Sequence, residues 1–157
     1  MFDETILLRV PKNYSINSKF SKFSLSNDDI LNDKHLSSDA KRIKITDFEN
    51  ESFLMMKSGN SINYHGFKIC HEAGFEPKTS IYFDRLMTSY NMAASGLGVC
   101  FVTDTLIKDV APSDTLLYYN IDSNYAKRTV YLLHKKKRYI NKVIREFMRT
   151  ALDIYSK

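Results

Sequence analysis

The polar run at residues 57–61, Lys-Ser-Gly-Asn-Ser, contains the groups best suited to bind a small ligand. Ser58 and Ser61 supply hydroxyls, and Asn60 supplies an amide. Gly59 allows a ligand to approach the backbone closely. A helical pattern follows the run, and the free N–H groups at a helix N-terminus favour an anion. The run therefore predicts an anion-binding turn, although Ser and Asn are also common residues in simple helix caps.

A second junction of the same kind follows the apolar run at residues 99–102. There Thr103 or Asp104 is expected to cap a short helix. If both apolar runs are neighbouring strands of one sheet, their ends converge on one cleft. Thr103 is therefore a further candidate ligand residue.

Residue pairs that could support catalysis or metal binding are missing from the sequence. Cys70 and His71 are adjacent, and neighbours on a helix point about 100° apart, so they are poorly placed to share a proton. The four histidines form no metal-ligand pattern. No GxGxxG or GxxxxGK[ST] motif occurs. We therefore predict no cofactor, no metal site and no enzymatic activity.

Strand-like and helix-like segments alternate along the chain, which is typical of an α/β protein with a largely parallel sheet. The region from residue 13 to 44 is polar and is predicted to be a long surface connection with one short helix capped by Asn27 or Asp28. The expected strands are residues 5–10, 52–56, 79–83, 99–102, 116–119 and 128–133, with a further ordered segment at 43–48. The expected helices are residues 28–36, 62–73, a helix capped by Asp84 that ends near 96, 105–110 and 140–155.

Bulk properties narrow the class of protein further. The net charge is +5, and much of the excess lies in the basic run at residues 134–138, which is interpreted as a solvated turn. Cys70 and Cys100 are too far apart in sequence for a local zinc or redox pair, and both are expected to be reduced. No apolar run approaches the roughly 20 residues that a membrane span needs. A cytoplasmic protein without membrane contact is expected.

Three segments resemble successive signatures of the effector-binding domain of LysR-type transcriptional regulators. They are Ile-Thr-Asp-Phe-Glu-Asn-Glu-Ser-Phe-Leu at 45–54, Glu-Ala-Gly-Phe-Glu-Pro at 72–77, and Met-Ala-Ala-Ser-Gly-Leu-Gly-Val at 92–99, followed by Phe-Val at 101–102. An Arg-led strand, a basic turn and a C-terminal helix follow in the same order. The resemblance covers about residues 5–152.

The resemblance implies a fold similar to type 2 periplasmic binding proteins, in which an effector binds between two lobes. By this analogy residues 12–116 form one complete lobe, and residues 1–11 and 117–157 form part of the other. Residues 59–61 match the effector loop of the family, with Ser61 where some relatives place a ligand-binding hydroxyl. Thr103 stands where many relatives have proline.

The resemblance also implies the partners. The expected ligand is a small anionic metabolite, and the expected assembly is a homo-oligomer, most simply a homodimer. The family's N-terminal helix-turn-helix and the opening strands of its first lobe are not in this sequence. The chain is therefore not expected to read DNA by itself, and its unpaired strand edges are expected to promote self-association. The alternative interpretation is a stand-alone solute-binding protein or an enzyme on the same scaffold.

Overall fold

The structure is a computed structural model that describes residues 2–136 and 139–155. The strands are β1 (Phe2–Pro11), β2 (Arg42–Ile43), β3 (Phe53–Met56), β4 (Thr79–Phe83), β5 (Val99–Thr103), β6 (Leu116–Ile121) and β7 (Lys127–Val130). The α-helices are α1 (Ile16–Lys19), α2 (Asn27–Leu31), α3 (Ser61–Glu72), α4 (Leu86–Ala94), α5 (Asp104–Asp109) and α6 (Lys142–Tyr155). Three 3-10 helices are η1 (Lys34–Leu36), η2 (Ile45–Phe48) and η3 (Asn124–Ala126). The predicted alternation of strands and helices is confirmed.

The sheet is mixed, with the strand order β2-β6-β1-β5-β3-β4 and with β7 paired to β1. Parallel pairing, as predicted, joins β3 to β4, β3 to β5, and β2 to β6. The prediction is wrong for β1, which runs antiparallel to β5, β6 and β7. Because β3 and β5 are parallel, their carboxyl ends lie on the same side of the sheet. On that side Ile6 of β1 pairs with Thr103 of β5.

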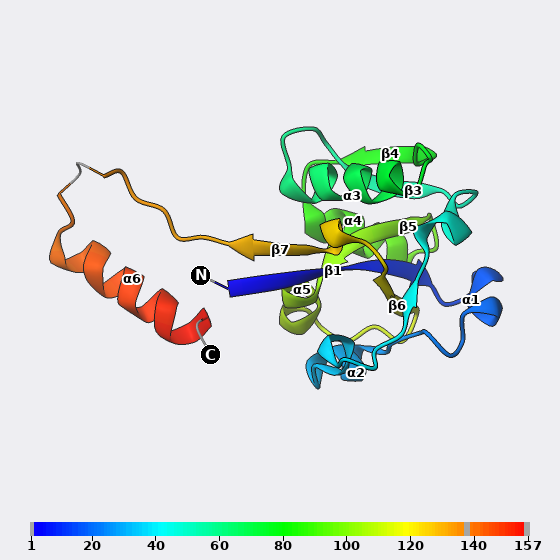
Figure 1. Cartoon of the computed structure of the whole chain (residues 1–157), viewed down its shortest axis with the longest axis horizontal. Helices are drawn as coiled ribbons and strands as arrows, with labels where there is room; N and C mark the ends of the chain where they lie inside the picture. The colour runs from blue at the N-terminus through cyan, green and yellow to red at the C-terminus, as the bar shows by residue number, and fades with distance from the viewer. Residues whose placement is uncertain (1, 137–138, 156–157) are drawn as a thin grey trace.

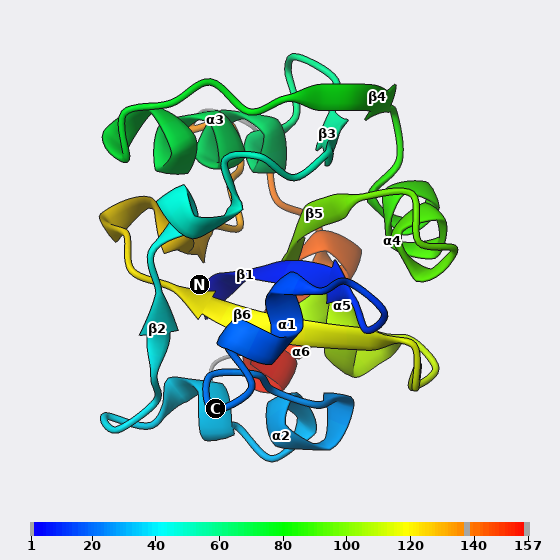
Figure 2. The ribbon, with the colours of Figure 1, turned by 90° about the vertical axis from the view of Figure 1, so that its right-hand side faces the viewer.

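Helices cover both faces of the sheet because its central strands are apolar on both sides. In β1, Ile6 and Leu8 join one buried core, which Ile69 of α3 also enters. Leu7 points to the opposite core, together with Ile107 of α5. Figure 2 shows α3 and α4 on opposite sides of β3 and β5. The result is a three-layered α/β/α body that holds the strand ends in place.

The polar region after β1 is more ordered than its composition predicts. It contains α1, α2, η1 and β2, and Leu25 forms a β-bridge with Tyr118 of β6. Helix α2 is capped by Ser26 and not by Asn27 or Asp28. The Ser26 hydroxyl accepts a hydrogen bond from the N–H of Asp29 (3.2 Å), whose carboxylate accepts one from the N–H of Ser26 (2.9 Å). This reciprocal capping box fixes the start of the helix.

The C-terminal part of the chain leaves the sheet. Strand β7 ends at Val130 and not at residue 133, and α6 begins at residue 142 and not at 140. Figure 1 shows α6 apart from the sheet, at the end of an extended segment that follows β7. None of the helices formed by the described residues combines the length and hydrophobicity that crossing a membrane requires.

The predicted lobe boundaries at residues 12 and 116 do not coincide with a break in the sheet. Residues 6–11 of β1 and residues 116–120 of β6 pair with each other or with β5, inside the same sheet as β3. Residues 2–5 of β1 pair with β7, and residues 120–121 of β6 pair with β2. The division of the chain between two lobes stays a prediction.

Arg9 is a charged residue in the middle of β1 and is fully buried. Its guanidinium lies over the ring of Tyr90, 3.1 Å from the ring centroid, and Nη1 donates to the carbonyl of the same residue. Burial lowers the pKa of Arg9, while Cys100 and the two tyrosines nearby act in the opposite direction. The cation is thus accommodated by an aromatic face and a carbonyl.

Candidate functional site

The junction between β3 and α3 is built as a tight turn. The N–H of Asn60 donates to the carbonyl of Lys57 (3.3 Å), and Gly59 has a φ of +89°, which favours glycine. The side-chain oxygen of Asn60 then accepts from the N–H of Ile62 (2.8 Å) and caps α3. The Asn60 side chain therefore serves as the predicted helix cap, while the turn leaves Ser58 and Ser61 exposed.

Asp84, predicted to cap the next helix, instead forms an ion pair beside this turn. Its carboxylate lies 2.9 Å from the ammonium group of Lys57, and both side chains are exposed. Helix α4 begins after Arg85, whose side chain makes no capping hydrogen bond. The prediction of an Asp84 cap is therefore wrong. The cation of Lys57 is held by Asp84.

Four of the five predicted ligand residues line one open hollow of about 530 Å³, here called the α3 hollow. Its walls are Ser58, Gly59, Asn60, Ser61, Asn63, Tyr64, Phe67, Lys68 and His71. Lys68 supplies a cation, and no aspartate or glutamate is among the lining residues. A hollow with hydroxyls, amides, a cation and a helix N-terminus is electrostatically suited to an anion.

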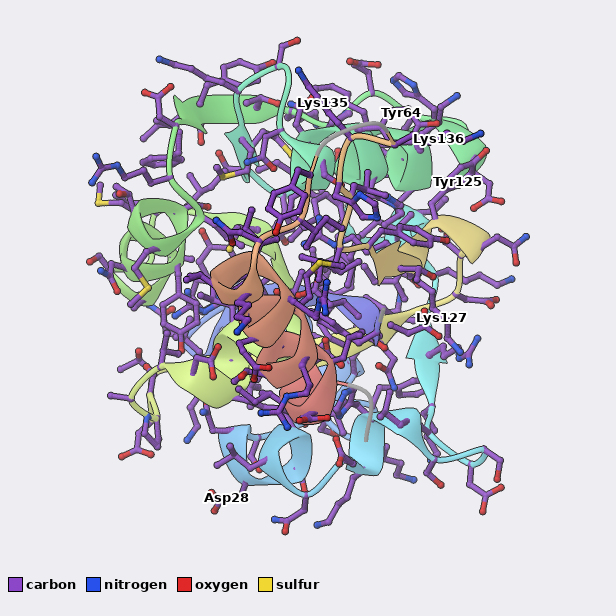
Figure 3. The ribbon with its side chains drawn as sticks, turned by 90° about the vertical axis from the view of Figure 1, so that its left-hand side faces the viewer. Asp28, Tyr64, Tyr125, Lys127, Lys135 and Lys136 are labelled. Carbon is purple, nitrogen blue, oxygen red and sulfur yellow. The ribbon has the colours of Figure 1, made fainter. Side chains whose placement is uncertain are left out.

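Aromatic side chains border the cationic part of this hollow. The ammonium group of Lys68 lies 5.8 Å from the ring centroid of Tyr64 and 6.0 Å from that of Tyr125. His65 Nδ1 lies 2.8 Å from the carbonyl oxygen of Tyr125 and joins α3 to η3. Figure 3, seen from the side on which α6 lies, shows Tyr64 and Tyr125 on this side of the molecule. The ring faces hold the Lys68 side chain near the hollow.

The junction between β5 and α5 differs from the first one. Thr103 is only 2% exposed, and its hydroxyl accepts from the N–H of Leu106 (3.3 Å) as the cap of α5. The pairing of β5 with β3 places this junction at the same edge of the sheet as the first one, as expected. Thr103 does not line the α3 hollow. A ligand-binding role for Thr103 stays a prediction.

A buried hydrogen-bonded pair that was not predicted, His35 and Asp104, lies directly beside Thr103. The Nε2 atom of His35 is 3.0 Å from the carboxylate of Asp104, and both side chains are almost inaccessible to solvent. The other carboxylate oxygen of Asp104 accepts from the N–H groups of Thr5 (3.0 Å) and Thr105 (2.9 Å). Asp104 therefore holds together η1, β1 and α5.

A second pair extends this network to β7. The carboxylate of Glu4, 6% exposed, accepts from Nε of Arg128 at 2.6 Å and also from the Thr105 hydroxyl. Residues far apart in sequence meet here, 124 positions in the case of Glu4 and Arg128. Local sequence patterns carry no signal for such contacts. The one available clue was an acidic residue, Asp104, directly after a buried strand.

Cys70 and His71, the pair considered for catalysis, differ in their exposure to solvent. Cys70 is buried, and burial raises the pKa of its thiol to about 12, so it is not a thiolate at neutral pH. His71 is exposed, and its Nε2 contacts the carboxylate of Glu76. Among the described residues, no group of three or more His, Cys, Asp or Glu side chains is arranged to hold a metal ion.

Comparison with known proteins places this geometry in a family. The LysR substrate binding domain family matches residues 30–155. The uncharacterized HTH-type transcriptional regulator YcgK of Bacillus subtilis (strain 168) is 27% identical over 104 residues, which are 66% of this chain and 31% of YcgK. The chain thus spans about a third of the length of this relative.

Solved structures share the fold at low sequence identity. The regulatory domain of Synechocystis PCC6803 CcmR, solved in complex with 2-PG, has a TM-score of 0.74 at 12% identity, covering 98% of this chain and 64% of that one. The effector binding domain of QuiR, solved in complex with shikimate, has a TM-score of 0.70 at 14% identity, covering 99% and 63%. The chain belongs to the family of LysR substrate-binding domains, the effector-binding part of LysR-type transcriptional regulators.

Proposed function

We propose that the α3 hollow binds a small anionic effector, with Ser58, Gly59, Asn60 and Ser61 as the anion-contacting turn. The observation that carries the proposal is that these four residues line one hollow with Lys68 and without a carboxylate. Two similar domains were solved with small molecules, 2-PG in CcmR and shikimate in QuiR. For this chain we propose small-molecule binding in general and neither of these two ligands in particular.

The proposed mechanism is a shift between conformations. A ligand changes an equilibrium only by binding one arrangement more tightly than another. A ligand bound in the α3 hollow would favour the conformation in which the carboxyl ends of β3 and β5 are covered. The Glu4–Arg128 and Asp104–Thr5 contacts connect this edge to β1 and β7. A binding role, and not catalysis, fits a hollow in which His71 is already engaged by Glu76.

We infer further that the chain acts in the cytoplasm and as a homodimer. Free, buried Cys70 and Cys100 fit a reducing compartment. Helix α6 presents the apolar side chains of Val143, Phe147 and Ile154 at 76%, 64% and 60% exposure. Exposed apolar faces of this kind mark contact surfaces. Sedimentation equilibrium at micromolar concentration is expected to show a dimer, and a single 18.2 kDa species would contradict it.

The experiment that tests the effector site is a thermal-shift screen of organic acids and amino acids, because a ligand raises the apparent stability by mass action. For each hit, Ser61→Ala is expected to weaken binding about tenfold, since it removes a hydrogen bond to a charged group. Ser18→Ala in α1, also an exposed serine, is the matched control. Equal affinity of the Ser61 variant and the parent chain for every hit would refute the assignment.

A further inference from the structure

Two neighbouring hollows lie at the edge of the sheet formed by β2 and β6, away from the turn at Ser58–Ser61. The wider one, of about 340 Å³, is here called the outer edge hollow, and the narrower one, of about 30 Å³, the inner edge hollow. They share Arg42 and Ser123 as lining residues. No lining residue is common to either of them and the α3 hollow.

The inner edge hollow is lined by two buried side chains that each have an unpartnered polar atom. These atoms are Nδ1 of His35 and Oδ1 of Asn120, in residues that are each 4% exposed. The Nε2 atom of His35 faces the carboxylate of Asp104, which can only accept, so Nε2 carries the hydrogen. In the neutral ring Nδ1 is then an acceptor, as Asn120 Oδ1 always is.

Two buried acceptors without a donor call for a ligand. A buried polar atom without a hydrogen bond costs about 1–3 kcal/mol, so such atoms normally have a partner. The inner edge hollow, of about 30 Å³, has room for one small group, and a group with two or more N–H or O–H bonds could serve both acceptors. A primary ammonium group has this size and three donors, and its hydrogen bonds to the two acceptors would have to offset the repulsion from Arg42 and Lys127, which also line the inner edge hollow.

The outer edge hollow carries charges of both signs. Arg42, Lys44 and Asp122 are exposed, and the side chains of these three residues form no hydrogen bond or ion pair with other described residues. Glu72 accepts from the hydroxyl of Ser123 at the same rim. Arg42 lines both hollows and is the cation that they share. A carboxylate attached next to the ammonium group would reach it there.

We propose that the two edge hollows form a second ligand site, independent of the α3 hollow, for a free α-amino acid. The ammonium group binds in the inner edge hollow to His35 and Asn120, and the carboxylate binds Arg42. The ligand side chain occupies the outer edge hollow, where Lys44 and Asp122 select for its polarity. Thr5 of β1 and Lys127 of β7 line the inner edge hollow, so a bound ligand lies beside the point where these two strands begin to pair.

The test is an NMR titration of the ¹⁵N-labelled chain with each of the common L-amino acids. At least one is expected to cause saturable shifts of the Asp122, Ser123 and Arg42 amides. For that amino acid, the analogue without the amino group and the analogue without the carboxyl group are expected to bind at least tenfold more weakly. These two analogues separate recognition of a zwitterion from recognition of either charge alone.

Variants separate this site from the effector turn. Arg42→Met changes an exposed side chain and is expected to weaken the amino acid at least tenfold, the loss of one charge-assisted hydrogen bond. His35→Gln removes the Nδ1 acceptor and is expected to weaken it similarly, whereas Ser61→Ala leaves it unchanged. An absence of saturable shifts at millimolar concentrations, as for a hollow that holds only water, would overturn the proposal. So would binding that Ser61→Ala abolishes and Arg42→Met does not affect.

Discussion

The two strand-to-helix junctions at the ends of β3 and β5 both carry polar helix-capping residues, but their structures differ. At the end of β3, Ser58 and Ser61 are exposed around a positive-φ glycine and border an open hollow. At the end of β5, Thr103 and Asp104 are 2% and 4% exposed and are fully engaged by the protein. The first junction is available to a ligand, and the second binds its own chain.

The position of each strand in the sheet explains the difference. Strand β5 lies next to β1, and η1 and α5 close over its end through His35 and Asp104. Strand β3 lies one place further out, between β5 and β4, and an exposed turn at Gly59 separates its end from α3. Capping chemistry alone does not make a binding site. The elements that cover the junction decide whether its polar groups stay free.

The largest expected effect is that of Asp104→Ala. The substitution removes an acceptor from His35, Thr5 and Thr105 and leaves buried donors unpaired, so the free energy of unfolding is expected to fall by about 3 kcal/mol. Urea denaturation measures it. Asp84→Ala, which breaks the exposed ion pair with Lys57, is the control, with a loss of less than about 0.5 kcal/mol. Similar losses of unfolding free energy in both variants would show that the two junctions do not differ in this way.

Thr103→Val is expected to lower the free energy of unfolding by about 1 kcal/mol, because it keeps the branched shape and removes the cap of α5. Its effect on effector affinity is expected to be less than about twofold, since the Thr103 hydroxyl is already hydrogen-bonded within the protein to the N–H of Leu106 and the hydroxyl of Thr105. Calorimetric titration with a hit from the screen measures this. A tenfold loss of affinity with an unchanged unfolding transition would show instead that Thr103 contacts the ligand.

The sequence was informative where local patterns determine the structure. Helix α3 (Ser61–Glu72) lies within one residue of the predicted range at each end, because Asn60 and Gly74 are strong cap signals. The strand β5 and the polar turn that borders the α3 hollow were also predicted from local sequence patterns. The lining residues beyond the turn, such as Lys68, follow from the helix once its start is known.

Long-range polar contacts were not predictable in this way. His35 lies 69 positions before Asp104, in a polar region whose weak periodicity allowed one short helix to be predicted but hid α1 and β2. The direction of β1 was also missed, since a buried strand has the same apolar pattern in parallel and antiparallel sheets. Strand β7 was predicted too long because apolar residues 131–133 continue its pattern beyond the last paired residue, Val130.

Gly59→Ala tests whether the turn of the first junction needs its backbone shape. Nothing lies within 4 Å of an added Cβ, so the cost is backbone strain at φ +89°, about 1 kcal/mol. Gly74→Ala, at φ +88° and equally uncrowded at the other end of α3, is the matched control. Both are expected to lose similar stability in urea, and only Gly59→Ala is expected to weaken the effector. Equal affinities would show that the turn geometry does not serve the ligand.

The smallest expected effect on stability belongs to Asn60→Asp. Aspartate caps a helix as well as asparagine, so the free energy of unfolding is expected to change by less than about 0.5 kcal/mol. The new negative charge lines the α3 hollow, however, where it replaces a neutral amide among residues that include no acid. Anionic hits are therefore expected to bind at least tenfold more weakly and to recover part of that loss at high salt, which screens exposed charges. Isothermal titration calorimetry at two salt concentrations measures the loss of affinity and its recovery at high salt. Asn60→Ser, an equally good cap without charge, should retain most of the affinity. If the aspartate variant binds anions as tightly as the serine variant, the polar turn after β3 is no more a ligand site than its buried counterpart after β5.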